Sequence, residues 1–225
     1  MASTTSRALF TLILATIVIS SEVVNIPGLG IIEGTSDDTH RSFKGVPYAA
    51  PPVGDLRWAN PEPVPAWQPS IWDGTFYRPG CPQSCYLPPH TCPTVQSEDC
   101  LYLNIFTPLD IQKPAPVMIW IPGGNFQQGT SGTTLYDGRF IANTTGIIVI
   151  TINYRLGALG WIATKDTLKG NYGFRDQRLA MKWVIKNIAA FGGNPSDITV
   201  VGQSAGASSI AGHLTSPYSR GLFQK

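Results

Sequence analysis

Charged residues are scarce in this chain, and the two signs nearly cancel. Asp and Glu together number 14 and Lys and Arg 16 among 225 residues, which gives a formal net charge of +2. A protein that binds nucleic acid through its phosphates needs a concentrated basic surface, and here the basic residues are scattered. The composition therefore argues against a nucleic-acid partner.

The chain also lacks an apolar run long enough to span a membrane, which takes about 20 residues. Residues 8–19 form an apolar run of only about 12 residues, preceded by the basic Arg7 and followed by the small Ser20. This order is typical of a secretory signal peptide, and a membrane anchor is the alternative. We expect residues 1–20 to be a signal peptide, residues 21–225 to form the secreted domain, and no part of it to span a membrane.

Cysteine is rare as well, and its four copies all lie between residues 81 and 100: Cys81, Cys85, Cys92 and Cys100. In a secreted protein such a cluster favours disulfides, for which four cysteines allow three pairings. A zinc site is the alternative, but the cluster lacks the closely paired Cys-x2-Cys spacing. We expect neither a metal site nor a cofactor.

The most informative stretch is residues 191–206, with the sequence FGGNPSDITVVGQSAG. Asn194 and Pro195 interrupt the preceding helix, a short β-branched strand follows, and then comes Gly-x-Ser-x-Gly before an Ala-rich helix. The bare pattern can arise by chance, but this strand-to-helix context is that of a nucleophile elbow. The backbone reverses so sharply at Ser204 that side chains at positions 202 and 206 would collide, which requires glycine at both. The sequence therefore predicts an exposed Ser204 on a strained turn between Gly202 and Gly206.

Two blocks, residues 191–206 and 97–105, resemble the signatures of the type-B carboxylesterase and cholinesterase family of α/β-hydrolases. Segments similar to other family landmarks occur in the same order, at residues 43–49, 56–58, 153–157 and 170–173. More loosely, Gln203 and the first three cysteines are similar to the slime-mould crystal-protein subgroup. The resemblance extends from about residue 30 to the last residue.

The resemblance implies an α/β-hydrolase fold: a mainly parallel central sheet flanked by helices, here truncated after the nucleophile elbow. Continuous apolar runs predict buried strands at residues 101–106, 117–121, 147–152 and 198–201. A helix is predicted over residues 176–190, with Leu179, Trp183, Val184 and Ile188 on its apolar face. The proline-rich residues 30–72 predict edge strands and irregular cover. The last strand is expected to leave an unpaired apolar edge.

The resemblance also implies site residues. The backbone N–H groups of Gly124, Asn125 and Ala205 would form an oxyanion hole for a substrate carbonyl. Pro122 and Asn125 stand where family members carry histidine and a third glycine, but asparagine tolerates positive φ best among non-glycine residues. A plain tight glycine turn is the alternative.

The family pairing would join Cys81 to Cys100 and leave Cys85 with Cys92. Separately, Asn143 is the one Asn-x-Ser/Thr acceptor with an allowed middle residue, so we expect it to be glycosylated.

The partners of the serine are missing from this sequence. An α/β-hydrolase carries an acid and then a histidine after the nucleophile, yet no Asp or Glu follows Ser204. His213, the only later histidine, lies on a helix that leads away from the elbow, and His40 and His90 sit in polar stretches expected to be solvated.

Two functions remain open. The first is a secreted serine ester hydrolase acting on a small-molecule ester, of which this chain is an N-terminal fragment that is inactive alone. The second is a non-catalytic adhesion or structural protein of the same fold. The intact serine elbow favours the hydrolase.

Overall fold

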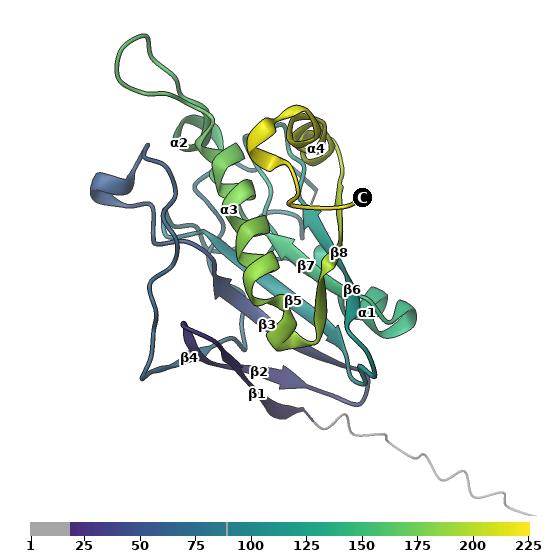
Figure 1. Ribbon diagram of the computed structural model, residues 1–225. Helices are drawn as coiled ribbons and strands as arrows, with labels where there is room; N and C mark the ends of the chain where they lie inside the picture. Colours follow the sequence, from purple (N-terminus) through teal and green to yellow (C-terminus); the bar gives the residue numbers. More distant parts are fainter. Residues whose placement is uncertain (1–18, 89) are drawn as a thin grey trace, which may run out of the picture.

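The computed structural model describes residues 19–88 and 90–225 (Figure 1). The predicted signal peptide therefore lies almost wholly outside the described residues, and only its last position, Ser20, falls in a strand. The strands are β1 Ser20–Ile26, β2 Gly30–Ser36, β3 His40–Pro47, β4 Ile71–Asp73, β5 Tyr102–Pro108, β6 Ala115–Ile121, β7 Ile148–Ile152 and β8 Gly193–Gly202. The α-helices are α1 Arg139–Thr145, α2 Gly157–Trp161, α3 Tyr172–Asn187 and α4 Ala205–Thr215. Four short 3-10 helices are η1 Gly54–Leu56, η2 Thr134–Tyr136, η3 Ile188–Phe191 and η4 Pro217–Ser219.

All eight strands belong to one sheet, in the order β1-β2-β3-β5-β7-β6-β8, with β4 paired to β2. The strands from β1 to β7 in this order pair antiparallel, whereas β7, β6 and β8 are parallel. The sheet is therefore mixed, and the expected parallel arrangement holds for β7, β6 and β8. These are the strands whose connections contain helices, which parallel neighbours require.

The sheet begins much earlier in the sequence than residue 101. β1, β2 and β3 pair in succession, and β3 also pairs with β5, so β3 is an inner strand. Its Phe43 and Val46 are fully buried. The prediction of edge strands over residues 30–72 is thus wrong for β3, because its polar residues alternate with the buried ones and shorten every apolar run.

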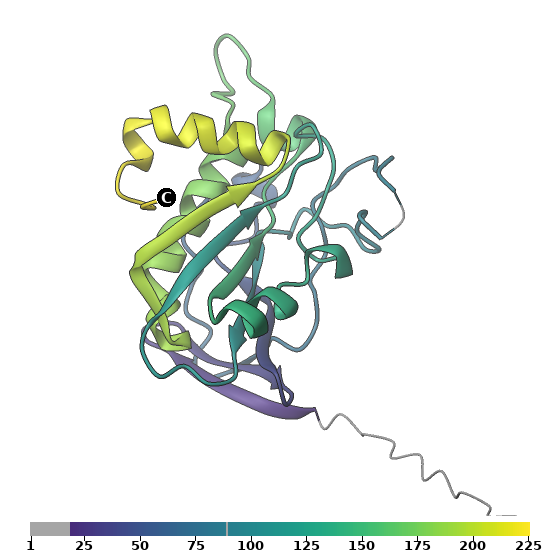
Figure 2. The same ribbon diagram turned by 90° about the vertical axis from the view of Figure 1, so that its right-hand side faces the viewer.

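Helices cover both faces of the sheet. Figures 1 and 2 show α3 in front of one face and α1 on the opposite face. α3 begins at Tyr172, four residues before the predicted start, and its buried face includes the polar Asp176 and Gln177 beside Trp183 and Val184. The apolar pattern missed the first turn, residues 172–175, because Gly173 disfavours a helix.

β8 starts at Gly193, ahead of the predicted residue 198, and so contains Asn194 and Pro195. The interruption of the preceding helix comes instead from Gly192, which has φ 88° at the end of η3. Pro195 is tolerated because β8 is the last strand of the sheet and its outer edge needs fewer N–H donors.

The outer edge of β8 is partly paired by the end of the chain, which corrects the expectation of an unpaired edge. Gln224 donates its N–H to the carbonyl of Ile198 at 2.9 Å, and Val200 donates to the carbonyl of Lys225 at 2.9 Å.

Two disulfides tie down the irregular segment before β5. The structure joins Cys81 to Cys100 and Cys85 to Cys92, the pairing that the resemblance implies. Cys81 and Cys100 lie in the core, with 1% and 0% of their surface exposed. The first disulfide therefore anchors this segment to the sheet, and the second closes a smaller loop at the surface.

Candidate active site

Ser204 lies on the turn between β8 and α4, at the end of the strand. Its backbone has φ 56° and ψ −121°, a conformation that L-residues rarely adopt, and its side chain is exposed. α4 begins at the next residue, Ala205. The sharp, strained strand-to-helix turn predicted from Gly-x-Ser-x-Gly is therefore present.

The two glycines around the serine are packed too closely for a side chain. A Cβ on Gly202 would lie 2.7 Å from the carbonyl carbon of Gly206. A Cβ on Gly206 would overlap the carbonyl oxygen of Ile121, at the end of β6. The expected collision between the two positions thus explains Gly202, whereas Gly206 is required mainly by the neighbouring strand.

The loop that follows β6 packs against this turn. A Cβ on Gly123 would lie 2.5 Å from the carbonyl oxygen of Gln203 and 3.1 Å from the Cβ of Ser204. Gly124 has φ 116° and Asn125 φ 56°. Asn125 therefore adopts the positive φ expected of it, and the structure brings Gly124, Asn125 and Ala205 to the same end of the sheet as Ser204.

The backbone N–H groups of these three residues form no hydrogen bonds among the described residues. Within the described part of the chain, no hydrogen bond takes up the N–H of Gly124, Asn125 or Ala205. Gly206, by contrast, donates its N–H to the carbonyl of Gln203 at 3.0 Å. Backbone donors left without a protein acceptor beside an exposed serine are suited to bind an oxyanion.

The shape of this loop depends on contacts that the sequence did not reveal. Tyr154 donates its hydroxyl to the carbonyl of Pro122 at 2.8 Å, and burial raises the pKa of the Tyr154 hydroxyl, so it stays a donor. Gln83 holds the far end of the loop through two hydrogen bonds with Gly129, of 2.6 and 2.9 Å. The only available signal was position, since Tyr154 falls in the family landmark at residues 153–157 and Gln83 lies between two cysteines.

A buried ion pair fixes the segment after β7 to α3. Arg155 donates two side-chain hydrogen bonds to the carboxylate of Asp176, at 2.7 and 2.8 Å, and its backbone N–H donates a third at 3.0 Å. The side chains are 3% and 0% exposed, so neither charge has water as an alternative partner. This pair holds the residues next to Tyr154 in one position.

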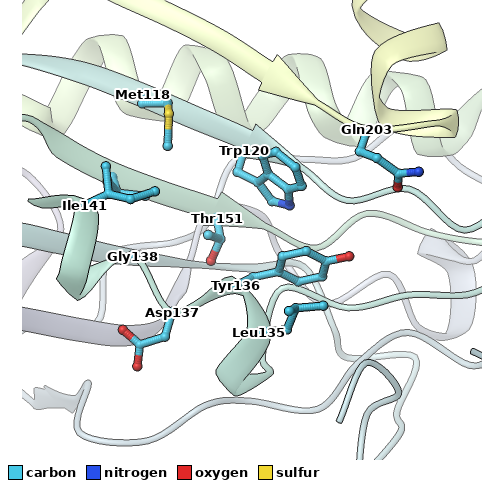
Figure 3. Close-up of a pocket in the computed structure, with 10 residues that line it drawn as sticks. Met118, Trp120, Leu135, Tyr136, Asp137, Gly138, Ile141, Thr151 and Gln203 are labelled. Atoms are coloured by element: carbon cyan, nitrogen blue, oxygen red, sulfur yellow. The ribbon is translucent and has the colours of Figure 1, made fainter. Parts of the chain in front are cut away.

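A largely apolar cavity of about 430 Å³ lies beside the turn, between β6, β7 and α1. Figure 3 shows Trp120 and Tyr136 facing it, with Gln203, the residue before Ser204, at the end of β8. The rings of Trp120 and Tyr136 lie 5.5 Å apart, and the indole N–H of Trp120 has no partner among the described residues. The cavity can hold an apolar group of a ligand next to the serine.

His213 is fully occupied with structural hydrogen bonds. Its Nδ1 lies 2.8 Å from the Ser219 hydroxyl and its Nε2 3.0 Å from the Gln177 Oε1. The Gln177 amide donates to Ser209, and Ser209 donates to the carbonyl of Ala205. Burial, together with the charge of Arg178, lowers the pKa of His213 to about 4, so the ring is neutral and donates through Nε2. Because both ring nitrogens of His213 are engaged, neither is free to accept the proton of Ser204.

The other two histidines also lie apart from the site. His90 is exposed, as expected. His40 is buried, with 6% of its surface exposed, and hydrogen-bonds to Thr39, so the expectation that it is solvated is wrong. It pairs with Pro108 at the opposite end of the sheet from Ser204. The burial of His40 could not be read from its polar neighbours in the sequence, because Thr39 and Asp37 hydrogen-bond to it in the folded protein.

The remaining predicted site residue, Asn143, is exposed on α1. Among residues 19–88 and 90–225, no group of three or more His, Cys, Asp or Glu residues could hold a metal ion. No helix in these ranges is both long and apolar enough to cross a membrane.

A serine on a strand-to-helix turn, at the end of a central sheet with helices on both faces, defines the α/β-hydrolase class of fold. The carboxylesterase family model matches residues 20–225, so the chain belongs to the carboxylesterase family. The chain is 47% identical to the crystal protein of Dictyostelium discoideum over 87% of its own length and 36% of the relative's. It is 45% identical to the para-nitrobenzyl esterase of Bacillus subtilis (strain 168), over 87% of this chain and 41% of the relative.

The structure is also similar to a solved thermophilic PNB esterase. The TM-score is 0.86 at 43% sequence identity, covering 92% of this chain and 43% of that chain. The cholinesterase of Mus musculus is 46% identical over 83% of this chain and 32% of the relative. The chain thus spans between 32% and 43% of the length of these relatives.

Proposed function

We propose that the chain is the N-terminal part of a secreted serine carboxylic ester hydrolase. The proposal rests on one observation: the strained turn at Ser204 packs directly against the loop from Gly123 to Asn125. A nucleophile with unpaired backbone donors beside it is what acyl transfer requires. Relatives named as esterases support the same reaction class.

In this reaction the Ser204 hydroxyl oxygen attacks the ester carbonyl carbon and loses its proton to a base. The N–H groups of Gly124, Asn125 and Ala205 stabilise the negative oxygen of the tetrahedral intermediate. The C–O bond of the ester then breaks, and the alcohol leaves with a proton. Water attacks the acyl-serine in the same way and releases the carboxylate, which restores Ser204. The apolar cavity beside Gln203 would accept part of the ester.

The base is the missing component. Ser204 is a weak nucleophile at its own pKa, and the one histidine after it, His213, is neutral and engaged at both nitrogens. We infer that the acid and the histidine belong to a longer protein of which these residues are one part. An oxyanion hole without its base leaves only about 10³–10⁴-fold catalysis over water, so residues 21–225 alone should be inactive as an esterase.

Secretion is the other part of the proposal. Two disulfides in the described residues are typical of proteins that fold in an oxidising compartment. The signal peptide at residues 1–20, the glycan on Asn143 and a small-molecule ester as the substrate complete the proposal.

Covalent labelling with an organophosphonate probe tests the function. The product of the whole gene should label stoichiometrically at Ser204, and Ser204→Ala should abolish the labelling. Ser208→Ala is the matched control, because Ser208 is an exposed serine one turn further along α4. Residues 21–225 alone should label at least about 1,000-fold more slowly.

Two results would count against the proposal. If the product of the whole gene did not label, the non-catalytic adhesion or structural role would be favoured. If residues 21–225 labelled rapidly, a base would exist within them, and the inference about a longer protein would be wrong.

A further inference from the structure

Another cavity lies at the far end of α4, between the first half of α3 and the η4 turn. Its volume is about 390 Å³, and its lining is polar and aromatic: Asn171, Phe174, Arg175, Arg178, Ser216 and Tyr218. Ser204 precedes the first residue of α4 and Ser216 follows the last, so about 17 Å of helix separates this cavity from the serine. In Figure 1 the η4 turn, in yellow, lies beside the upper part of α3.

The cavity is positively charged and has no compensating acid. Arg175 and Arg178 are three residues apart on α3, so they lie on the same face of the helix. None of the residues that line the cavity is acidic. Among the described residues, neither arginine forms a salt bridge; Arg175 donates to the neutral amide oxygen of Asn60, and Arg178 only stacks on the Tyr218 ring at 5.3 Å.

This arrangement differs from that of four other arginines, although Arg78 and Arg220 likewise form no salt bridge among the described residues. A carboxylate partner accompanies Arg41, Arg57, Arg139 and Arg155. Burial and the charge of Arg175 both lower the pKa of Arg178, which means that its positive charge is held at a cost. An anion in the cavity would remove that cost by pairing with both guanidinium groups.

The walls of the cavity indicate more than an inorganic ion. Phe174 and Tyr218 supply aromatic surface in the lining, and the hydroxyl groups of Ser216 and Tyr218 supply further donors. A volume of about 390 Å³ is many times that of a single water, which is about 30 Å³. An anion with an apolar or aromatic body would fill the space and contact the walls.

We propose that this cavity, the α3–η4 cleft, binds a small organic anion whose carboxylate pairs with Arg175 and Arg178 and whose aromatic body packs on Phe174 and Tyr218. A phosphate group presents the same oxyanion chemistry, and the test distinguishes the two. The cleft is independent of the reaction proposed for Ser204, because it shares no residue with that site.

Isothermal titration calorimetry of the secreted product of the whole gene with benzoate, acetate and inorganic phosphate, at constant ionic strength, tests the proposal. Benzoate should bind saturably and more tightly than acetate or phosphate. Arg178→Gln should weaken benzoate binding by about tenfold or more, because a charge-assisted hydrogen bond is lost. Arg175→Gln, a second variant at a partly exposed position, should weaken it as well.

Two further variants separate charge from shape. Lys182→Gln removes the same charge from an exposed position on α3 outside the cleft and should change benzoate binding less than twofold. Tyr218→Phe, at a residue that is 75% exposed, keeps the ring and removes the hydroxyl, and it should leave benzoate bound more tightly than phosphate; Tyr218→Ala removes both and should weaken benzoate several-fold more than phosphate.

Three results would each overturn the proposal. The first is a lack of saturable benzoate binding, and the second is an equal loss of benzoate affinity in Arg178→Gln and Lys182→Gln. The third is phosphate binding as tight as that of benzoate, with no effect of Tyr218→Ala. The last would reduce the cleft to a simple oxyanion site. Circular dichroism of each variant verifies that it is folded.

Discussion

Gly206 and Gly212 lie on the same helix but differ in what surrounds their α-carbons. A Cβ on Gly206 would overlap the Ile121 carbonyl oxygen, which belongs to the rigid backbone of β6. A Cβ on Gly212 would meet only the Phe174 ring, at 3.0 Å, and a ring can shift. Position 206 therefore tolerates no side chain, whereas position 212 is tight against a single side chain.

Two alanine variants test this difference. Gly206→Ala should lower the free energy of unfolding by about 2 kcal/mol or more, because the helix must move away from β6. Gly212→Ala should lower the free energy of unfolding by less than about 1 kcal/mol. The close contact with Phe174 destabilises the variant, but the preference of alanine over glycine in a helix, also about 1 kcal/mol, offsets part of that loss. Urea unfolding followed by circular dichroism measures both. Equal losses in the two variants would show that the contact with Ile121 does not set the position of α4.

Individual backbone conformations at the site were only partly predictable from the sequence. The positive φ of Asn125 follows from its residue type and from the family position, and Ser204 follows from Gly-x-Ser-x-Gly. Phe126 also has a positive φ, of 60°, and nothing in its type indicates it. Its carbonyl accepts the Gly157 N–H at 2.8 Å, a contact between segments 31 residues apart that no local pattern encodes.

At the scale of helices, α3 and α4 are joined by a polar chain rather than by apolar contacts alone. It runs from Ser219 through His213 and Gln177 to Ser209. The ring of His213 also stacks on Phe174, with 3.9 Å between the ring centroids. Every hydrogen bond in this polar series has a donor and an acceptor when His213 is neutral. A second proton on the ring would turn its acceptor nitrogen into a donor.

Acid should therefore weaken the contact between α3 and α4. The pKa of His213 is about 4 in the folded protein against 6.5 for the free group, so the unfolded state binds the proton first as the pH falls. The contribution of this group to stability is fully present above about pH 6.5 and is lost progressively toward pH 4. The loss should reach about 3 kcal/mol at most.

Urea unfolding of the wild type and His213→Gln between pH 8 and pH 4 measures this contribution. The variant should be less stable at pH 8, and the difference should shrink as the pH falls, because glutamine does not titrate. His90→Gln, at an exposed histidine, is the control and should follow the wild type throughout. A constant difference between wild type and His213→Gln would contradict the assignment.

The elements themselves were predicted unevenly, for physical reasons. β5, β6 and β7 are continuous apolar runs buried in the sheet, and the sequence located each of them within a few residues. β1, β2 and β3 alternate polar and apolar residues, so their pattern resembled that of irregular cover. The early start of α3 was missed because its first turn, residues 172–175, contains Gly173, and glycine is a poor helix former.

At the scale of the whole molecule, exposed apolar side chains gather on the described surface near the apolar cavity. Leu135 and Ile141, which line the apolar cavity beside Gln203, are exposed, and so is Phe140, the residue before Ile141. Asn143 lies on the same short helix as Phe140 and Ile141, with its own side chain exposed. A glycan there would stand beside the apolar region and screen it from contact with other molecules.

Secretion and glycosylation can be tested together in a eukaryotic secretory host. The secreted protein should begin near Ser21 and carry one endoglycosidase-sensitive glycan on Asn143, because the acceptor is exposed and the chain would pass through the compartment that forms its disulfides. Asn143→Gln should remove the glycan. Thr145→Ala is the matched control: it destroys the acceptor motif while keeping Asn143, and it should have the same effect on mass.

Loss of the glycan should leave the disulfides intact and increase self-association, because Leu135, Phe140 and Ile141 are then uncovered. Secreted protein that retained Met1 would contradict the cleaved signal peptide, and secreted protein without a glycan on Asn143 would contradict the predicted glycosylation.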